Sequence, residues 1–255
     1  MKILAIGDVF SECGVKHTQI VLKDIINDEA IDFVIANGEN ASGSGISIGA
    51  YDELIDAGVD FITLGNHAYG KKDVYSLFET QPNIIRPLNY GDKGDGSKIV
   101  KCKDKKIGII NIMGRVGIDE SINSPFDVVS DEIKKISDKC DFIIVDFHAE
   151  ATSEKKAMMY YLDKKVSILF GTHTHIQTSD AQITKNGLGY ITDLGMTGAI
   201  DSVLGVDKDV ILDRFVNNAR GKFTYAYSDA MLSGCIFEID ENTNKCTNIK
   251  IINVR

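Results

Sequence analysis

The sequence is poor in the residues that mark linkers between domains. It has only three prolines and no tryptophan among 255 residues. It shows no Gly-, Ser- or Pro-rich linker, no internal repeat and no low-complexity tract. Because 44% of the residues are hydrophobic, the chain can bury a full core. We therefore expect a single domain that spans residues 1–255.

Cysteine is also scarce and lacks any CxxC pair. The five cysteines are odd in number and scattered, which fits free thiols in a reducing compartment and gives no zinc-finger spacing. The start of the chain, MKILAIGDVF, has a short apolar run that Asp8 interrupts. That run is too short for a signal peptide or a membrane span. We expect a cytoplasmic protein that does not enter a membrane.

Positive charge is in deficit as well, since the formal net charge is -9. This balance argues against the broad basic surface that grips the backbone of long nucleic acids. A nucleotide, or the end of a nucleic acid, remains open as a ligand. Its phosphate would need a local positive centre that the side chains do not obviously supply.

Short β-branched apolar runs recur along the chain, and each ends in a polar cluster. Runs of this kind, bounded by Gly, Asn and Asp, are typical of strands buried on both faces. The runs and their clusters are MKILAI then GDVF, DFVIA then NGEN, DFITL then GNH, DFIIVDF then HAE, and VSILF then GTHTH.

Helical spacing and hairpin signals fill the intervals between these runs. Helices are expected over 17–27, over 47–57 and, after Ser124-Pro125, over 126–136. Hairpins are expected over 98–113, 181–192 and 233–254. Strand-helix-strand alternation predicts parallel pairing with right-handed crossovers. The expected fold class is α/β, with two packed mixed sheets and helices outside them.

The polar clusters gather four of the five histidines at strand ends. In open α/β sheets, ligands bind beyond the carboxyl ends of the strands. His173 and His175 are two residues apart, a spacing that would place both on one strand face and suit chelation. The candidate residues are Asp8, Glu39, Asn40, Asn66, His67, His148, His173 and His175.

The chemistry of these residues indicates a metal site. Imidazole, carboxylate and amide groups without a thiolate suit a divalent ion such as Mn, Fe, Ni, Co or Zn. One tetrahedral site cannot use so many ligands, whereas two ions roughly 3.5–4 Å apart and bridged by a carboxylate can. Two such ions would make the pocket positive inside an acidic protein. We therefore expect two divalent metal ions, with Fe, Mn and Zn as the leading candidates, and a phosphate ester as substrate.

The order GD, NGEN, GNH, HAE and GTHTH resembles the calcineurin-like metallophosphoesterases, whose usual pattern is D-x-H, GD, GNH and GHxH. The glutamate of NGEN and the stretches FHAEATSEK, GTHTHIQTSD and TDLGMTG look more narrowly like the bacterial YmdB-like phosphodiesterases. The likeness spans nearly the whole chain.

This resemblance implies a four-layer αββα sandwich and a dinuclear site. Transferred onto matching positions, one metal would be held by Asp8, Glu39, Asn40 and His175. The other would be held by Glu39, Asn66, His148 and His173, so that Glu39 bridges the two. His67 would be a catalytic acid or a phosphate contact. The family's histidine in D-x-H is missing here because position 10 is Phe, and Asn40 is the obvious substitute.

These features lead to a metal-dependent phosphodiesterase that acts on small phosphodiesters such as 2′,3′- or 3′,5′-cyclic nucleotides. Two alternatives stay open: a phosphomonoesterase with the same two ions, and a metal- or nucleotide-binding regulatory protein with little turnover. The oligomeric state is not readable from the sequence. Residues 198–223 are also open, because an amphipathic helix over 206–215 would suit either a lid over the site or an ordinary surface excursion.

Overall fold

Two β-sheets packed face to face form the centre of the molecule in the computed structural model, which describes residues 1–255. The first sheet has eight strands, and β14 (Lys245–Val254) pairs with its strand β13. The other strands, in spatial order, are β2 (Asp8–Val9), β12 (Met196–Ala199), β13 (Ala230–Asp240), β1 (Lys2–Ile6), β3 (Phe33–Asn37), β4 (Phe61–Thr63) and β5 (Ile84–Ile85).

The second sheet has six strands and contains two of the predicted hairpins. In spatial order they are β10 (Gln182–Ile183), β11 (Gly189–Ile191), β9 (Ile168–Thr172), β8 (Phe142–His148), β7 (Lys105–Met113) and β6 (Ser97–Cys102). The pairs β6–β7 and β10–β11 are antiparallel, as predicted, and so is β13–β14 in the first sheet. The strands β7, β8, β9 and β11 run parallel to one another.

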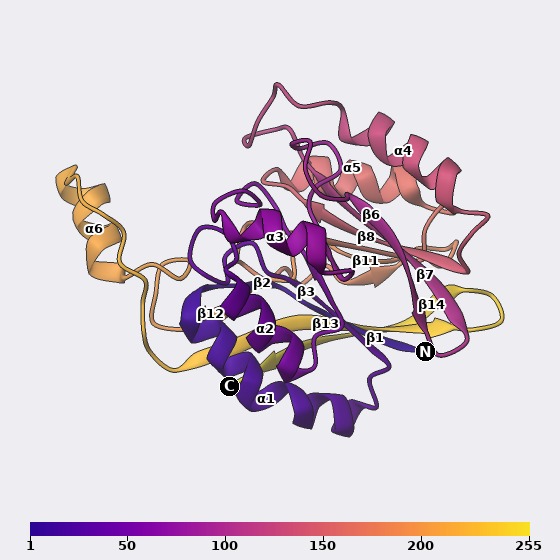
Figure 1. Ribbon diagram of the computed structural model, residues 1–255, viewed down its shortest axis with the longest axis horizontal. Helices are drawn as coiled ribbons and strands as arrows, with labels where there is room; N and C mark the ends of the chain where they lie inside the picture. Colours follow the sequence, from indigo (N-terminus) through magenta and orange to yellow (C-terminus); the bar gives the residue numbers. More distant parts are fainter.

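Helices cover the outer faces of both sheets. One group packs on the first sheet and consists of α1 (Ser11–Glu29), α2 (Ile48–Ala57) and α3 (Asp73–Thr80). The other packs on the second sheet and consists of α4 (Pro125–Ile136) and α5 (Thr152–Leu162). Figure 1 shows α1 and α2 on one side of the paired sheets and α4 and α5 on the other. The expected four-layer αββα sandwich is confirmed.

Alternation along the strands explains why the layers form. In β1, Ile3 and Ala5 point into the core between the two sheets, while Leu4 and Ile6 point into the core under the first group of helices. A strand turns successive side chains to opposite faces, so an unbroken apolar run must be covered on both sides. The same alternation in β8 sends odd and even positions to the helix layer and to the core between the sheets.

Local signals set the ends of the predicted helices. The Ser47 side chain accepts a hydrogen bond from the Ala50 amide at 3.2 Å at the start of α2. Gly58 ends that helix with φ of +116°, a conformation that favours glycine. Ser124 precedes Pro125 at the first position of α4. The predicted ranges 47–57 and 126–136 are therefore confirmed, and 17–27 lies within the longer α1.

The carboxyl ends of the parallel strands meet at one end of the sandwich. Strands β3 and β4 end side by side in the first sheet, and β8 and β9 do so in the second. A hydrogen bond of 2.6 Å from Thr63 at the end of β4 to Asp146 in β8 ties the two sheets together there. Every polar cluster predicted at a strand end is thus brought to the same region.

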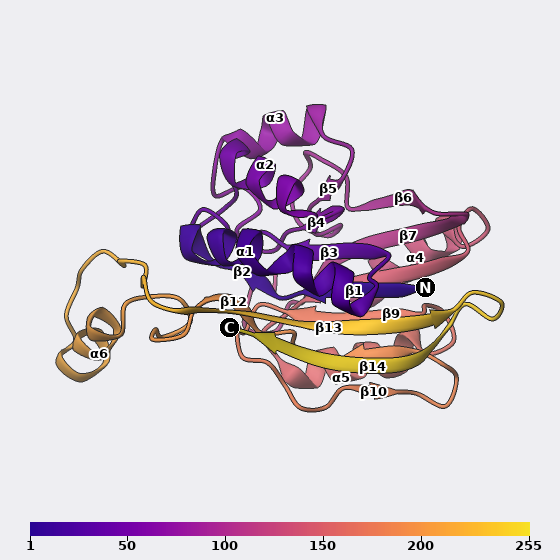
Figure 2. The same cartoon turned by 90° about the horizontal axis from the view of Figure 1, so that it is seen from below.

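Helix α6 (Lys208–Asn217) stands apart from the body of the protein, as both ribbon views show (Figures 1 and 2). It begins at Lys208, so the predicted start at position 206 is wrong, because Val206 forms a bridge with Val203 and Tyr225 instead. Within α6 only Ile211 is buried, and Phe215 is 77% exposed. The helix does not cover the site in this structure. No helix combines the length and the apolar composition that a membrane crossing requires.

Candidate metal centre

A cavity of about 310 Å³ opens at the carboxyl ends of the strands. It contains two carboxylates and three imidazoles but no lysine or arginine. Its lining residues are Phe10, Glu39, Asn40, His67, Glu150, His173, Thr174, His175 and Leu204. A phosphate ester entering this cavity would meet negative charge, unless cations were bound there. The side chains alone therefore do not make an anion site.

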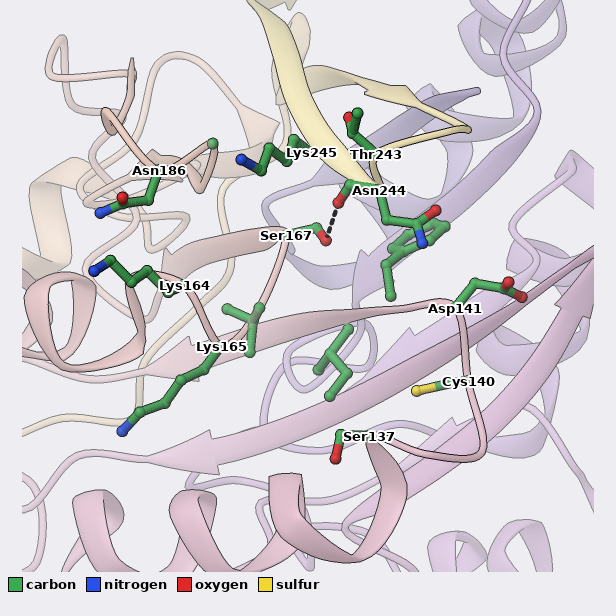
Figure 3. A pocket seen from close by; sticks show the side chains of 14 residues that line it. Ser137, Cys140, Asp141, Lys164, Lys165, Ser167, Asn186, Thr243, Asn244 and Lys245 are labelled. Carbon is green, nitrogen blue, oxygen red and sulfur yellow. Dashed lines mark hydrogen bonds between the residues drawn. The ribbon is translucent and has the colours of Figure 1, made fainter.

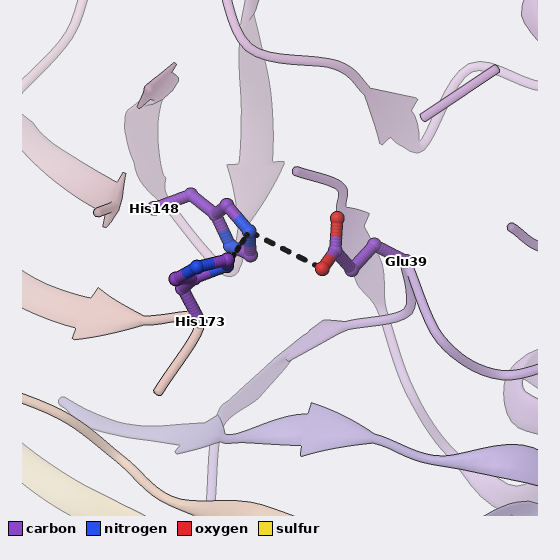
Figure 4. A group of neighbouring side chains, drawn as sticks. All are labelled: Glu39, His148 and His173. Carbon is purple, nitrogen blue, oxygen red and sulfur yellow. Dashed lines mark hydrogen bonds and ion pairs between the residues drawn. The ribbon is translucent and has the colours of Figure 1, made fainter. Parts of the chain in front are cut away.

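Three possible ligand atoms converge on the Nε2 atom of His148, which is itself a fourth. Its Nε2 atom lies 2.9 Å from Asn66 Oδ1, 3.1 Å from His173 Nδ1 and 3.2 Å from Glu39 Oε1. Figure 4 shows the two imidazoles and the carboxylate turned toward one another. The ligand atoms of Glu39, His148 and His173 all lie within 4.8 Å of each other. This set matches the four residues expected at one of the two metals.

The remaining predicted ligands lie on the other side of Glu39. His175 Nε2 is 3.9 Å from Asp8 Oδ1 and 3.4 Å from the Asn40 side-chain nitrogen, which is itself 3.0 Å from Glu39 Oε1. Asp8 is completely buried, and its Oδ1 atom has no hydrogen-bond partner. A buried carboxylate oxygen without a partner carries a large desolvation cost. A bound cation would supply such a partner.

The amide of Asn40 is oriented for hydrogen bonding rather than for metal coordination. Its nitrogen faces both Glu39 Oε1 and His175 Nε2. Divalent cations accept electron pairs from oxygen and not from an amide nitrogen. Asn40 would therefore have to turn its amide over to act as the ligand that replaces the missing histidine.

Glu39 joins the two groups of residues, and its environment favours the charged form. Its Oε1 atom faces His148, and its Oε2 atom accepts a hydrogen bond of 2.8 Å from the His67 main-chain amide. Burial alone would raise the pKa of Glu39, but the charge and hydrogen bond of His148 and the His67 amide lower it to about 2. The carboxylate is thus available at neutral pH as a bridging ligand.

Burial and nearby charges also shift the pKa values of the groups around Glu39. Burial raises the pKa of Asp8 to about 6, against the opposing effect of His175 and His148. Burial would lower the pKa of His148, yet Glu39 and Asp8 raise it to about 9. Burial and the adjacent His148 lower the pKa of His173 to about 3. These carboxylates therefore draw positive charge into the space between them, and a metal ion satisfies the same demand.

The turn after β9 differs from the expectation that His173 and His175 share one strand face. Strand β9 ends at Thr172, and both histidines lie beyond it with positive φ, +100° for His173 and +64° for His175. Backbone in this region costs about 1–3 kcal/mol for a residue other than glycine. The turn brings the His173 ring to His148 and Glu150 and the His175 ring to Asp8 and Asn40, whereas a flat strand would carry both rings on one face. The backbone strain therefore occurs in a turn from which both histidine rings reach the other candidate metal ligands.

The second nitrogen of each imidazole also has a partner, and sequence reasoning did not find these partners. His148 Nδ1 lies 2.9 Å from Thr172 Oγ1, His173 Nε2 lies 3.1 Å from Glu150 Oε2, and His175 Nδ1 lies 3.2 Å from the Leu204 carbonyl oxygen. Metal-binding histidines in proteins are held by such contacts to the ring nitrogen that does not touch the metal. Glu150 belongs to the HAE cluster at the end of β8, whereas no sequence pattern indicates the Leu204 contact.

His67 lies at the wall of the cavity and outside both sets of converging atoms. Its Nδ1 atom is 3.1 Å from Ser44 Oγ. This leaves Nε2 as the ring nitrogen that could meet a bound molecule. Its role as a catalytic acid or a phosphate contact remains a prediction.

Two further residues shape the site. A Cβ atom on Gly65 would lie 2.2 Å from His148 Nε2 and 2.4 Å from Glu39 Oε2, so the close approach of the GNH loop requires glycine there. Phe10, at the position of the missing histidine, packs its ring edge-on against His175 with centroids 5.5 Å apart. Phe10 therefore supports a candidate ligand and does not act as one.

A buried ion pair holds the turn that carries His173 and His175. Lys155 Nζ lies 2.7 Å from Asp193 Oδ2 and donates a 2.8 Å hydrogen bond to the Thr172 carbonyl oxygen. The same Asp193 oxygen accepts hydrogen bonds from the amide and the hydroxyl of Thr174. Both members of the pair are almost fully buried. Helix α5 thereby fixes the main chain on each side of His173.

Comparison with known proteins is consistent with the geometry of the site. The model of the YmdB-like protein family matches residues 4–252. Over 255 residues the chain is 39% identical to the 2′,3′-cyclic-nucleotide 2′-phosphodiesterase of Bacillus subtilis, with 99% of this chain and 96% of that protein covered. This chain and the Bacillus subtilis protein are therefore similar to each other over nearly their whole lengths.

Solved structures give the same result for the fold. A phosphatase from Mycoplasma pneumoniae superimposes with a TM-score of 0.93 at 34% identity, covering 100% of this chain and 93% of that one. The NAD nucleotidase of Haemophilus influenzae superimposes with a TM-score of 0.61 at 11% identity, covering 99% of this chain and 55% of that one. The second likeness concerns the fold alone, which is the calcineurin-like metallophosphoesterase fold.

Proposed function

The chain belongs to the YmdB-like family, and from this premise we propose that it is a metal-dependent phosphodiesterase that hydrolyses small phosphodiesters. Cyclic nucleotides with a 2′,3′ linkage are the first candidate substrates, because the Bacillus subtilis relative is named for that activity. Cyclic nucleotides with a 3′,5′ linkage are the second.

One observation carries the proposal: two groups of ligand atoms share Glu39 in a cavity that contains carboxylates but no lysine or arginine. An anionic phosphodiester can bind there only if cations offset the carboxylates. The Oδ1 atom of Asp8 supports the same assignment, because it is buried and accepts no hydrogen bond. Imidazole and carboxylate ligands without a thiolate suit Mn, Fe or Zn.

We assign the ligands as two groups around Glu39. Asp8, Asn40 and His175 would hold one ion, and Asn66, His148 and His173 the other, with Glu39 common to both. Two bound ions would supply Lewis acidity and positive charge for phosphoryl transfer. The main-chain amide of His67 donates to Glu39 and so orients the carboxylate that the two ions would share.

His67 is the candidate general acid. Its Nδ1 atom is held by Ser44, and the ring forms part of the cavity wall. The free Nε2 atom could then donate a proton to the oxygen that leaves phosphorus. Glu150 binds His173 and keeps that ring from rotating away from Glu39.

Two other functions use the same cavity. A phosphomonoesterase would have the same ligands and the same charge balance, and a regulatory protein could bind metal or nucleotide with little turnover. A panel of monoesters and diesters separates the first of these from the proposal. Binding without hydrolysis would indicate the second.

The decisive test combines metal content with hydrolysis. Protein purified without chelator is analysed for metals, then assayed on bis-p-nitrophenyl phosphate and on 2′,3′-cyclic AMP, beside Glu39→Gln. We expect about two metals per chain in the wild type. We expect turnover in Glu39→Gln to fall by at least about 100-fold, because the shared carboxylate becomes a neutral amide.

The outcomes are distinct. Absence of bound metal and of turnover, even after reconstitution with Mn or Fe, would overturn the proposal. Faster hydrolysis of monoesters than of diesters would favour the phosphomonoesterase.

A further inference from the structure

A chain of buried hydrogen bonds connects two of the proposed ligands, Glu39 and His148, through the interface between the sheets. It passes through side chains from the three strands β3, β8 and β9. The linking residues are Asn37, Asp146 and Thr172, and all of them are at most 1% exposed. Polar groups buried this deeply need defined partners, so the direction of each hydrogen bond is fixed by its neighbours.

The main chain sets the direction at the Glu39 end. The Glu39 amide donates to Asn37 Oδ1 at 3.1 Å, so the Asn37 nitrogen must point the other way. That nitrogen donates to Asp146 Oδ2 at 3.1 Å. An amide nitrogen can only donate, so Asp146 Oδ2 can only accept here. Thr63 donates to the same oxygen at 2.6 Å.

The direction continues to the imidazole of His148. Thr172 Oγ1 donates its single proton to Asp146 Oδ1 at 2.7 Å. The hydroxyl oxygen is then left as an acceptor for His148 Nδ1, 2.9 Å away. A proton on Nδ1 leaves the lone pair of a neutral ring on Nε2, the atom that faces Glu39, Asn66 and His173.

We propose that Asp146 and Thr172 are positioning residues that fix His148 in the tautomer able to bind a metal through Nε2. This inference rests on the proposed function. Carboxylates usually contact a metal-binding histidine directly. Here the Thr172 hydroxyl stands between the two, which lets one buried carboxylate in β8 direct a ring on its own strand through the neighbouring strand β9.

The substitution Asp146→Asn would reverse the direction of these hydrogen bonds, because asparagine has nearly the shape of aspartate but carries a donor on one side. Because the Asn37 nitrogen must meet an oxygen, the new amide has to place its nitrogen beside Thr172. The Thr172 hydroxyl would then accept a hydrogen bond from that nitrogen and donate to His148 Nδ1. The ring would carry its proton on Nε2, where a metal should bind.

The test measures the tautomer and the metal separately. Because Glu39 and Asp8 raise the pKa of His148 to about 9, nitrogen-15 NMR of the histidine rings is recorded above that pH, where the ring is neutral, and reports whether Nδ1 carries the proton in the metal-free protein. Competition with a chelator reports the affinity for Zn and Mn. We expect a protonated Nδ1 in the wild type and an unprotonated Nδ1 in Asp146→Asn. We expect metal affinity to fall by about 10–100-fold in Asp146→Asn and in Thr172→Val.

Two matched variants guard against a merely structural effect. Thr172→Ser keeps the hydroxyl and should restore the tautomer and most of the metal affinity that Thr172→Val loses. Thr63→Val removes a donor from the other oxygen of the same carboxylate and should leave His148 Nδ1 protonated. Circular dichroism shows which variants fold, and Asp146→Asn with Thr172→Ser suffices if Thr172→Val does not.

The results separate this inference from the proposed function. An unchanged tautomer and unchanged metal affinity in Asp146→Asn would overturn the inference while leaving the function intact. Wild-type protein that binds no metal would overturn the function, and the NMR measurement would still decide the tautomer. Equal losses in Thr63→Val and Thr172→Val would mean that the network only stabilises the fold.

Discussion

The two ends of strand β9 show what separates a strained turn with a function from one without. Lys164, before the strand, has φ of +75°, and His173 and His175, after it, have φ of +100° and +64°. The His175 ring faces the buried carboxylate of Asp8, and the His173 ring contacts Glu150 and His148, whereas the Lys164 side chain is exposed. Positive φ alone therefore does not mark a site. It becomes informative where the side chain on the strained residue is itself held by partners.

The cavities at the two ends of β9 also differ in the charged residues that line them. A cavity of about 370 Å³ at the amino end is lined by Lys164, Lys165 and Lys245 among others. Figure 3 shows the ammonium groups of Lys164 and Lys165 at its outer side, away from Ser167. Basic residues gather at this end, yet none of these three lysines is buried. The carboxyl end has no lysine or arginine in its lining, so it would be the better phosphate site only with cations bound, as we propose.

The most damaging change at the carboxyl end is expected to be a single added methyl group. In Gly65→Ala the new Cβ would lie 2.2 Å from His148 Nε2 and must push the ring or the loop aside. Displacements of about 1 Å at such a site cost about 100-fold in rate. We expect at least that loss of hydrolysis of bis-p-nitrophenyl phosphate, together with reduced metal content.

Gly49→Ala is the control for that experiment, because its added methyl group meets nothing within 4 Å. It should keep wild-type turnover. Full activity in Gly65→Ala would mean that catalysis takes place away from His148 and Glu39.

A smaller but global effect is expected from the ion pair that anchors the carboxyl-end turn. Lys155→Met leaves Asp193 charged and buried without its partner. Breaking a buried pair from one side costs about 3–5 kcal/mol. The free energy of unfolding from a urea titration should fall by that amount.

The adjacent Lys156→Met is the matched control, since Lys156 and Asp180 are partly exposed and 3.5 Å apart. It should cost about 1 kcal/mol or less. Equal losses in the two variants would show that the Lys155–Asp193 pair has no special role in holding the turn.

The four layers of the fold and the candidate metal ligands could be predicted from the sequence, because both depend on short, regular patterns. Apolar runs such as the one in β8 are buried on both faces whatever follows them, and their polar ends must then meet at one edge of the sheets. All seven predicted ligands do lie around Glu39 and Asp8. Their assignment to metals remains a prediction.

The parts that sequence reasoning missed depend on the exact path of the main chain. The spacing of His173 and His175 suggested a strand, but the strained turn arises from contacts with Lys155 and Asp193 that lie far away in the sequence. The carbonyl of Leu204 reaches His175 because Leu204 has φ of +53° in a tight turn between Val203 and Val206. A carbonyl contact of this kind has no residue-type signature. The start of α6 was missed because Val206 pairs with Val203 before the helix begins.

The mildest prediction compares one substitution at both ends of β9. Lys164→Gly relieves the left-handed backbone, worth about 1–2 kcal/mol, while the added freedom of the unfolded chain takes back about 0.5–1 kcal/mol. We expect the free energy of unfolding to rise by about 0.5–1 kcal/mol, with unchanged metal content and turnover. His175→Gly relieves similar strain but removes a ring that contacts Asp8, so metal content and turnover should fall whatever happens to stability. A loss of activity in Lys164→Gly would show that the amino-end turn also serves the site, and the contrast between the two ends of the strand would fail.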